Sequence, residues 1–484
     1  MNFGFLRFLT GRLLMVTGAL LLLPVVVAAI YREWAPGGVF IAIAACAAGI
    51  GALLSWKKPE RKEFYAREGF VATSLSWIVM SLVGCLPFIF TGAIPDPIDA
   101  LFETVSGFTT TGGSILRTVE GEYMYRCVQF WRCFTHWIGG MGVLVFILAI
   151  LPMADGYGIH LMRAESPGPT ASKLVPKLGS TAKILYLIYI FFTVAESILL
   201  MITGMPVYDS ITITFSTVGT GGFGVRDGGI GIYPVASQVV ITVFMILCSI
   251  NFNAWYLIFI GQGRKVWKVE EIRVYLLMVF GSALCITTNI LSQERLSVPL
   301  TFHHALFNVA SITSTTGFAT LDFNTWPEFS RMLLAILTFI GACAGSTGGG
   351  FKVSRLIILL KSAANELVFV THRKSVRRVH VDGKSLDSQT VKSVAAYATL
   401  YATVFFVSTI LIAVNGFDFT TNVAAVAATL NNVGPGLNVV GPSGNYASFS
   451  AFSKLVFIFD MLAGRLELLP LLILFKPATW RRNA

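Results

Sequence analysis

Apolar runs about as long as a bilayer is thick recur from one end of this chain to the other. Examples lie at residues 13–30, 70–90, 184–201 and 455–475. Because lipid offers the backbone no hydrogen-bond partner, such runs fold as helices that satisfy their own amide groups. Of the 484 residues, 55% are hydrophobic and only 13% are charged, which leaves no stretch for a soluble domain of ordinary size. The sequence therefore predicts an all-α polytopic membrane protein.

Positive charge gathers in alternate connections between these runs. The basic segments lie within residues 57–67, 163–183, 264–273, 373–392 and 476–482. Loops rich in Lys and Arg stay on the cytoplasmic side, so these loops and both termini are predicted to be cytoplasmic. This placement explains the net charge of +11 without a nucleic-acid partner. The opposite loops carry acids such as Asp209, Asp227 and Asp418, which predicts either a mildly acidic outer mouth or ordinary solvated loops.

The chain divides into a helix pair, predicted at about 11–32 and 38–56, and a unit that repeats four times. Each unit consists of an apolar helix, a short amphipathic segment, a Gly-centred polar turn and a second apolar helix. The first helices are predicted at about 68–93, 181–204, 271–292 and 392–415, and the second at about 127–151, 236–261, 330–369 and 450–475. Ten spans result. The predicted boundaries are 1–56 for the N-terminal helix pair and 57–152, 153–263, 264–372 and 373–484 for the four pore repeats.

The amphipathic segments, at 98–109, 206–216, 302–314 and 419–431, are too short to cross a bilayer and too polar to face lipid. A re-entrant helix followed by a loop solves both problems, because irregular backbone at membrane depth is tolerated only where it lines a cavity or protein. The negative C-terminal end of each half-helix would then favour a cation.

Each turn centres on a glycine, at Gly112, Gly219, Gly317 or Gly434. Glycine reaches backbone angles that let successive carbonyls face one axis, where they can replace the hydration shell of a monovalent cation. Four such loops predict one pseudo-fourfold filter that binds potassium, with no transition metal. The predicted filter residues are Thr110, Thr111, Gly112, Gly113, Thr217, Val218, Gly219, Thr220, Thr315, Thr316, Gly317, Phe318, Asn432, Val433, Gly434 and Pro435.

Several motifs together resemble the Trk/Ktr/HKT superfamily of cation transporters, and in particular its TrkH-type potassium uptake proteins. They are the stretches 103–112, 139–142, 163–169, 344–350, 428–436 and 464–467. The resemblance covers essentially the whole chain. It implies potassium uptake through a channel-like path, a homodimer in the bacterial inner membrane, and a separate cytosolic nucleotide-binding ring of the TrkA type. It also implies a less symmetric filter, because Asn432 stands where its counterparts have Thr.

The second helix of the third repeat is interrupted by five glycines between residues 341 and 350, which cannot hold a regular helix. A Gly-rich packing face is one interpretation. The other, which the resemblance supports, is an intramembrane gate under the filter formed by Gly345, Ser346, Thr347, Gly348, Gly349 and Gly350. Arg465 lies in the last apolar run, where insertion of an arginine costs about 2.5–3.5 kcal/mol. In the family the matching arginine is a gate contact; an ion pair with Asp460 or Glu467 is the alternative.

Other patterns point to other functions more weakly. Residues 219–224 match GxGxxG without the strand and helix that a dinucleotide site requires, and 345–350 lack the Lys of a P-loop, so no bound nucleotide is expected. The pair His303–His304 suits packing better than metal binding, since adjacent helical side chains diverge. Ser346 without a nearby base gives little support to an intramembrane hydrolase. A proton- or sodium-coupled symporter would need buried acids, for which Glu196, Asp460 and Glu467 are the candidates.

Overall fold

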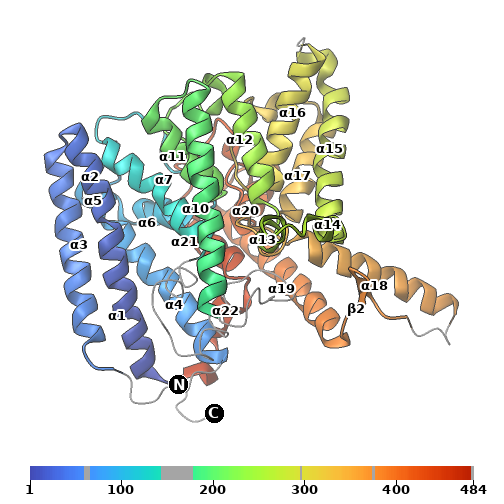
Figure 1. The fold of residues 1–484 in the computed structure, drawn as a ribbon, viewed down its shortest axis with the longest axis horizontal. Helices are drawn as coiled ribbons and strands as arrows, with labels where there is room; N and C mark the ends of the chain where they lie inside the picture. The colour runs from blue at the N-terminus through green and yellow to red at the C-terminus, as the bar shows by residue number, and fades with distance from the viewer. Residues whose placement is uncertain (59–65, 143–177, 295–296, 373–376, 481–484) are drawn as a thin grey trace.

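The computed structural model describes residues 1–58, 66–142, 178–294, 297–372 and 377–480. The chain begins with α1 (Phe3–Leu20), α2 (Leu22–Tyr31) and α3 (Trp34–Ser55), of which α1 and α3 lie side by side at one edge of the bundle (Figure 1). Small residues permit this contact: a Cβ added to Gly11 would lie 2.7 Å from the carbonyl oxygen of Gly51. The helix pair expected at the N-terminus is confirmed, and it packs on the first repeat through α4 (Ala66–Gly84).

Four repeats follow, each opened by a long helix. These first helices are α4 with its short continuation α5 (Leu86–Phe90), α10 (Leu178–Ile202), α15 (Glu270–Glu294) and α19 (Ser388–Ile412). By length and composition, six helices of the described residues could cross a membrane, or seven if the bent pair α12–α13 is one span. In the part of the chain that the structure describes, the ten predicted spans are therefore not all single apolar helices.

The short helices predicted to precede the glycines are present. They are α6 (Pro97–Phe108), α11 (Val207–Val218), α16 (Val298–Thr313) and α20 (Phe419–Leu430). Two of them begin at aspartates whose carboxylates cap free amide groups: Asp96 accepts from Ile98 and Asp99, and Asp418 accepts from Thr421. Their C-terminal turns are almost completely buried, which places the polar loops that follow inside the protein.

In the second, third and fourth repeats the second helix is divided into two pieces, whereas in the first repeat the structure describes only α7, which ends at Gly140. The pieces are α7 (Arg126–Gly140), α12 (Val235–Cys248) with α13 (Phe252–Phe259), α17 (Glu328–Ile340) with α18 (Val353–Thr371), and α21 (Ala451–Arg465) with α22 (Leu469–Leu472). The break was expected only in the third repeat. The continuous helices expected at 236–261 and 450–475 are wrong, because α12 and α13 meet at 97° and α21 stops at Arg465. In the first repeat, the part of the predicted second helix after residue 142 lies outside the described residues, and so does the motif at 163–169.

The eight central helices close into a ring. α7 packs between the pore helices α6 and α11, and α12 packs between α11 and α16. α17 then packs between α16 and α20, and α21 packs between α20 and α6, so the last repeat contacts the first. This cyclic order confirms the predicted fold of four helix–loop–helix units around one axis.

Short elements complete the description. The only strands in the described part of the chain are β1 (His380–Val381) and β2 (Lys384–Ser385), an antiparallel hairpin between α18 and α19. One further short helix is α14 (Gly263–Val266), and the 3₁₀ turns are η1 (Ile230–Ile232), η2 (Phe323–Thr325), η3 (Ala413–Asn415), η4 (Asn438–Val440), η5 (Ile473–Phe475) and η6 (Pro477–Trp480). All seven cysteines are free, and five of them are buried.

Candidate functional site

The four loops after the pore helices share one backbone conformation. Two residues past each helix end, a residue other than glycine has a φ between 54° and 59°: Thr110, Thr220, Thr315 and Asn432. Two residues further on, each loop has a glycine at a φ between 77° and 90°: Gly112, Gly222, Gly317 and Gly434. Left-handed threonines are strained and persist only where the surroundings impose them, which is typical of functional sites.

This register corrects the predicted second loop. Gly222, not Gly219, is the counterpart of Gly112, because Gly219 caps α11 in a helical conformation at φ −71°. Thr217 and Val218 likewise belong to the last turn of α11. The hydrogen bonds agree: the amide of Gly221 donates to Ser216 O at 2.7 Å, just as that of Thr111 donates to Ser106 O at 2.8 Å.

Each glycine lies against a carbonyl oxygen of the next loop. A Cβ added to Gly112 would lie 1.9 Å from Gly221 O, and one added to Gly222 would lie 1.9 Å from Thr316 O. A Cβ added to Gly317 would lie 2.1 Å from Val433 O, and one added to Gly434 would lie 2.5 Å from Thr111 O. The four contacts run once around the axis and close on themselves. Only glycine fits these positions, because any side chain would collide with a neighbouring backbone.

A cavity of about 220 Å³ opens directly onto this ring and is lined by all four glycines. Its other walls are the stretches that follow the glycines, and we call it the vestibule. The charged residues of its lining are Arg117, Arg132, Arg226 and Asp227. An acidic mouth is therefore wrong for this cavity. Several outer acids have structural partners instead, such as Asp209, whose carboxylate accepts from Arg226 at 3.1 Å.

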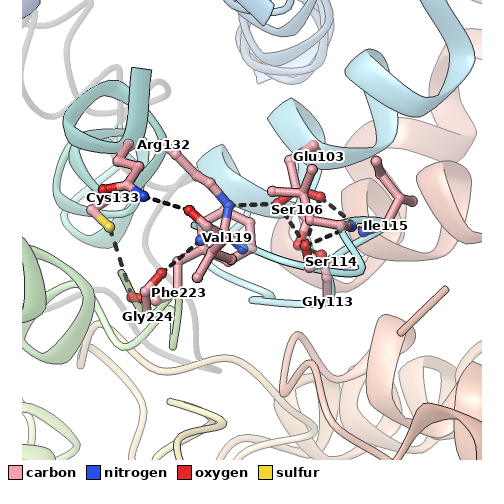
Figure 2. Close-up of polar contacts among 12 residues, drawn as sticks. Glu103, Ser106, Gly113, Ser114, Ile115, Val119, Arg132, Cys133, Phe223 and Gly224 are labelled. Carbon is pink, nitrogen blue, oxygen red and sulfur yellow. Dashed lines mark hydrogen bonds and ion pairs between the residues drawn. The ribbon is translucent and has the colours of Figure 1, made fainter. Parts of the chain in front are cut away.

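A buried ion pair supports the first two loops from behind (Figure 2). Arg132 donates through Nε to Glu103 at 2.6 Å and through its Nη1 to Gly224 O at 2.9 Å. Glu103 also accepts from the Ser114 hydroxyl at 2.9 Å and the Ile115 amide at 3.0 Å. No role was assigned to Glu103 or Arg132 from the sequence. The signal that could have identified them is the presence of a charged residue within an apolar segment.

The fourth loop is held by side chains of its own. Asn432 Nδ2 donates to Thr111 Oγ1 at 3.0 Å and to Met461 O at 2.9 Å. The hydroxyl of Tyr446 donates to Gly434 O at 2.8 Å, and the Tyr446 amide donates to Ser114 O at 2.8 Å. Asn432 therefore joins the last loop to the first.

The glycine-rich break between α17 and α18 forms a loop against the ends of two pore helices. We call residues 341–352, which include the residues predicted to form a gate, the gate loop. The amide of Gly349 donates to Thr315 Oγ1 at 2.7 Å, and a Cβ on Gly348 would lie 2.8 Å from Ser314 O. The break after α12 touches the same loop, since the Phe252 amide donates to Gly345 O at 2.9 Å. Helix ends at Ile340 and resumes at Val353, so the predicted interruption is correct.

Arg465, the last residue of α21, contacts the gate loop directly. Its Nη1 donates to Thr347 O at 2.8 Å, while its Nη2 donates to the carbonyls of Gly139 and Gly140 at the end of α7. Glu467, the alternative partner named from the sequence, pairs with Arg355. The guanidinium thus joins the end of α7, the gate loop and the end of α21.

His136, His303 and His304 all contact other side chains. His136 stacks on Phe223 with ring centroids 4.2 Å apart. His303 and His304 form hydrogen bonds with Gln238 at 2.9 Å and Thr320 at 3.0 Å. Glu196 is different, because it is fully buried in α10 and neither carboxyl oxygen has a hydrogen-bond partner among the residues that the structure describes.

Comparison with known proteins gives consistent matches along the whole chain. The family model TrkH, described as a cation transport protein, matches residues 37–482. The Trk system potassium uptake protein TrkH of Salmonella typhimurium is 38% identical over 488 residues, which cover 99% of this chain and 100% of that protein. The protein TrkG of Escherichia coli K12, named for the same system, is 32% identical over 492 residues, with 99% and 100% covered.

A solved structure matches the fold. It is the crystal structure of the potassium transporter TrkH from Vibrio parahaemolyticus, with a TM-score of 0.89 at 33% identity, covering 99% of this chain and 100% of that chain. The ring of pore helices, the four glycine loops and these full-length matches all lead to one assignment: the chain belongs to the TrkH family of cation transport proteins.

Proposed function

We propose that this chain carries potassium into the cell through the ring of loops, which acts as its selectivity filter. The observation that carries the proposal is the closed sequence of contacts between the four glycines and the carbonyls of the neighbouring loops. Ion filters in proteins replace the hydration shell with such carbonyl oxygens. The names of the relatives, which are potassium uptake proteins of the Trk system, support potassium as the ion.

The proposed filter residues are those of the predicted set with the second loop shifted by three positions. They are Thr110, Thr111, Gly112, Gly113, Thr220, Gly221, Gly222, Phe223, Thr315, Thr316, Gly317, Phe318, Asn432, Val433, Gly434 and Pro435. The left-handed residue at the start of each set turns the chain, and the glycine permits the approach of the next loop.

The gate loop and Arg465 are proposed to close the path beneath the filter. The loop lies against Ser314 and Thr315, at the end of a pore helix where an ion leaving the filter would pass. Arg465 places a positive charge at the same level and holds Thr347 in position. A cation then crosses only when the loop moves aside.

The surroundings are proposed from the sequence and the relatives. The chain would act as a homodimer in the bacterial inner membrane, with both termini in the cytoplasm and a TrkA-type nucleotide-binding ring as regulator. Charge asymmetry between loops supports the orientation. The naming of the relatives after a Trk system supports a multi-component assembly.

Flux from purified protein in liposomes tests the proposal. Gradients of potassium, sodium and caesium should reveal a potassium-selective, voltage-dependent flux that reverses at the potassium equilibrium potential. Addition of the TrkA-type ring should change the magnitude of this flux. Replacement of Arg465 by Ala should raise the flux, because the gate loop loses a charge-assisted anchor worth about 1.5–3 kcal/mol. Arg331→Ala, which removes the bonds of another arginine to Glu328 and Asn438 and does not touch the gate loop, is the matched control and should leave the flux unchanged. Equal flux in the two variants would count against the gate.

A symporter coupled to protons or sodium is the second candidate, and Glu196 favours it. An ionised carboxylate without partners is costly to bury, so this group either keeps a proton or binds a cation. In that case a pH gradient alone would drive rubidium uptake in wild type but not in Glu196→Gln.

A further inference from the structure

Two adjacent glutamates at the start of α15 contact the gate loop and the hairpin that follows α18. Glu271 is 8% exposed, and its Oε1 accepts from the amides of Ala344 at 2.8 Å and Ser354 at 3.0 Å. Ala344 lies near the start of the gate loop, and Ser354 lies in the first turn of α18. One carboxylate oxygen therefore holds both ends of residues 345–352.

The contact with Ser354 supplies a helix cap that α18 lacks. The first amides of any helix have no partner within the helix. The capping position of α18 is occupied by Lys352, whose side chain makes no capping bond and whose φ is 82°. Glu271 provides the acceptor from another helix, so the start of α18 depends on a residue 83 positions away in the sequence.

Glu270 makes the complementary contacts on the other side. Its Oε2 accepts from Lys361 Nζ, in α18, at 2.7 Å. Its amide donates to Asp382 Oδ1, at the turn of the β1–β2 hairpin, at 2.7 Å. Lys361 also donates to His380 O at 2.8 Å, so the hairpin, α18 and Glu270 form one connected unit.

The helix that carries both glutamates is itself firmly held. α15 packs along the pore helix α16, and its buried face includes Tyr275, Val279 and Ile286. The two glutamates thus lie between a helix that supports the third filter loop and a segment that follows the gate loop.

We propose that Glu270 and Glu271 form the joint through which a displacement of the β1–β2 hairpin reaches the gate loop. Glu271 is a positioning residue that fixes the loop beneath the filter, and Glu270 connects it to the hairpin. The inference rests on the proposed gating function of the loop. A cytosolic partner that moves the hairpin would act on both ends of the loop at once.

Cys343 provides a native reporter of the joint, because it is fully buried beside Ala344. The experiment uses the full-length protein in liposomes. It measures potassium flux together with the rate at which a cationic thiol reagent modifies Cys343, read by mass spectrometry. The variants are Glu271→Ala, Glu271→Gln and Lys361→Met. Glu366→Gln, an exposed charge on α18, is the matched control.

Loss of Glu271 removes two charge-assisted hydrogen bonds, so flux and Cys343 modification should both rise about tenfold in Glu271→Ala. Glu271→Gln keeps a neutral acceptor and should give a smaller rise. Lys361→Met should also raise the modification rate, although Lys361 does not touch the gate loop, and Glu366→Gln should match wild type.

Wild-type flux and wild-type Cys343 labelling in both Glu271 variants would refute the proposed joint. An unchanged rate of Cys343 modification in Lys361→Met would refute the connection to the hairpin. If Glu271→Ala does not fold, Glu271→Gln and Lys361→Met decide the question. Absence of potassium flux in every variant, with faster Cys343 modification in Glu271→Gln, would refute the proposed function and leave the joint standing.

Discussion

Replacing Glu103 by Gln should destabilise the protein more than any comparable change at an exposed ion pair. Glu103 is 0% exposed and its partner Arg132 is 4% exposed. The substitution keeps the size of the side chain and leaves the Arg132 guanidinium buried without a counter-charge. Removal of one member of a buried pair costs about 3–5 kcal/mol, and the remaining amide acceptor places the expected value near 3 kcal/mol.

Glu120→Gln is the control for this prediction. Glu120 pairs with Arg226 at 3.0 Å, but these side chains are 42% and 31% exposed, and Arg226 keeps its bond to Asp209. Exposed pairs contribute about 0–1 kcal/mol. The two variants therefore remove the same charge from a pair and differ mainly in burial.

The assay is equilibrium unfolding of both variants in mixed detergent micelles, with rubidium and sodium flux measured on the folded fraction. If the proposed filter is correct, Glu103→Gln should also lose selectivity, because Arg132 and Ser114 position its first two loops through this carboxylate. If the two variants unfold within about 1 kcal/mol of each other, the buried pair does not stabilise the fold as argued. Intact selectivity in Glu103→Gln would show that the loops do not depend on it.

Three further predictions follow from the loops and the outer surface. Gly222→Ala should abolish rubidium uptake, since a Cβ there would lie 1.9 Å from Thr316 O, and uptake at the wild-type rate would refute the corrected register. Asn432→Ala should lower the free energy of unfolding by about 1–3 kcal/mol, because Thr111 Oγ1 and Met461 O lose a shared donor, and chemical denaturation measures this. Hydrogen bonding to Arg226 lowers the pKa of Glu120 below its usual 4.5, so the stability from this contact is complete above that pH and is lost as the pH falls further. Unfolding curves of wild type and Glu120→Gln should converge at acid pH and separate at neutral pH.

The repeat architecture could be predicted because it follows from local sequence patterns. Apolar runs, short amphipathic segments and glycines recur in order, and each constrains the backbone by itself. The register of the second loop could not be predicted in the same way. Ser216, Thr217 and Gly219 imitate the polar residues and glycine of the other loops, but the helix continues through Val218, and only the three-dimensional contacts distinguish Gly219 from Gly222.

The breaks in the second helices show a similar limit. At residues 249–251 a capping signal was present, because the Asn251 side chain accepts from the Asn253 amide at 2.8 Å. At the end of α21 the residues with positive φ are not glycines: Glu467 and Leu468 take φ values of 61° and 60°. Their conformation depends on tertiary contacts, such as the pair of Glu467 with Arg355, which lie 112 residues apart.

The fourth loop has Asn432 where the other loops have Thr, and this difference is best explained by the contact that the last loop makes with the first. Its φ at Asn432 is 54°, against 55°, 54° and 59° at Thr110, Thr220 and Thr315, so the change of side chain leaves the backbone of the filter intact. The asparagine acts instead at the contact between the last loop and the first, where it binds Thr111 across 321 positions of sequence. Closing a loop of about 320 residues costs only about 1 kcal/mol more than closing one of about 100, by the logarithmic dependence of loop entropy on length. One net hydrogen bond is worth about as much, so Asn432 alone can offset the extra cost. We infer that selectivity, which depends on carbonyls, tolerates this asymmetry because Asn432 helps to stabilise the junction between the last loop and the first.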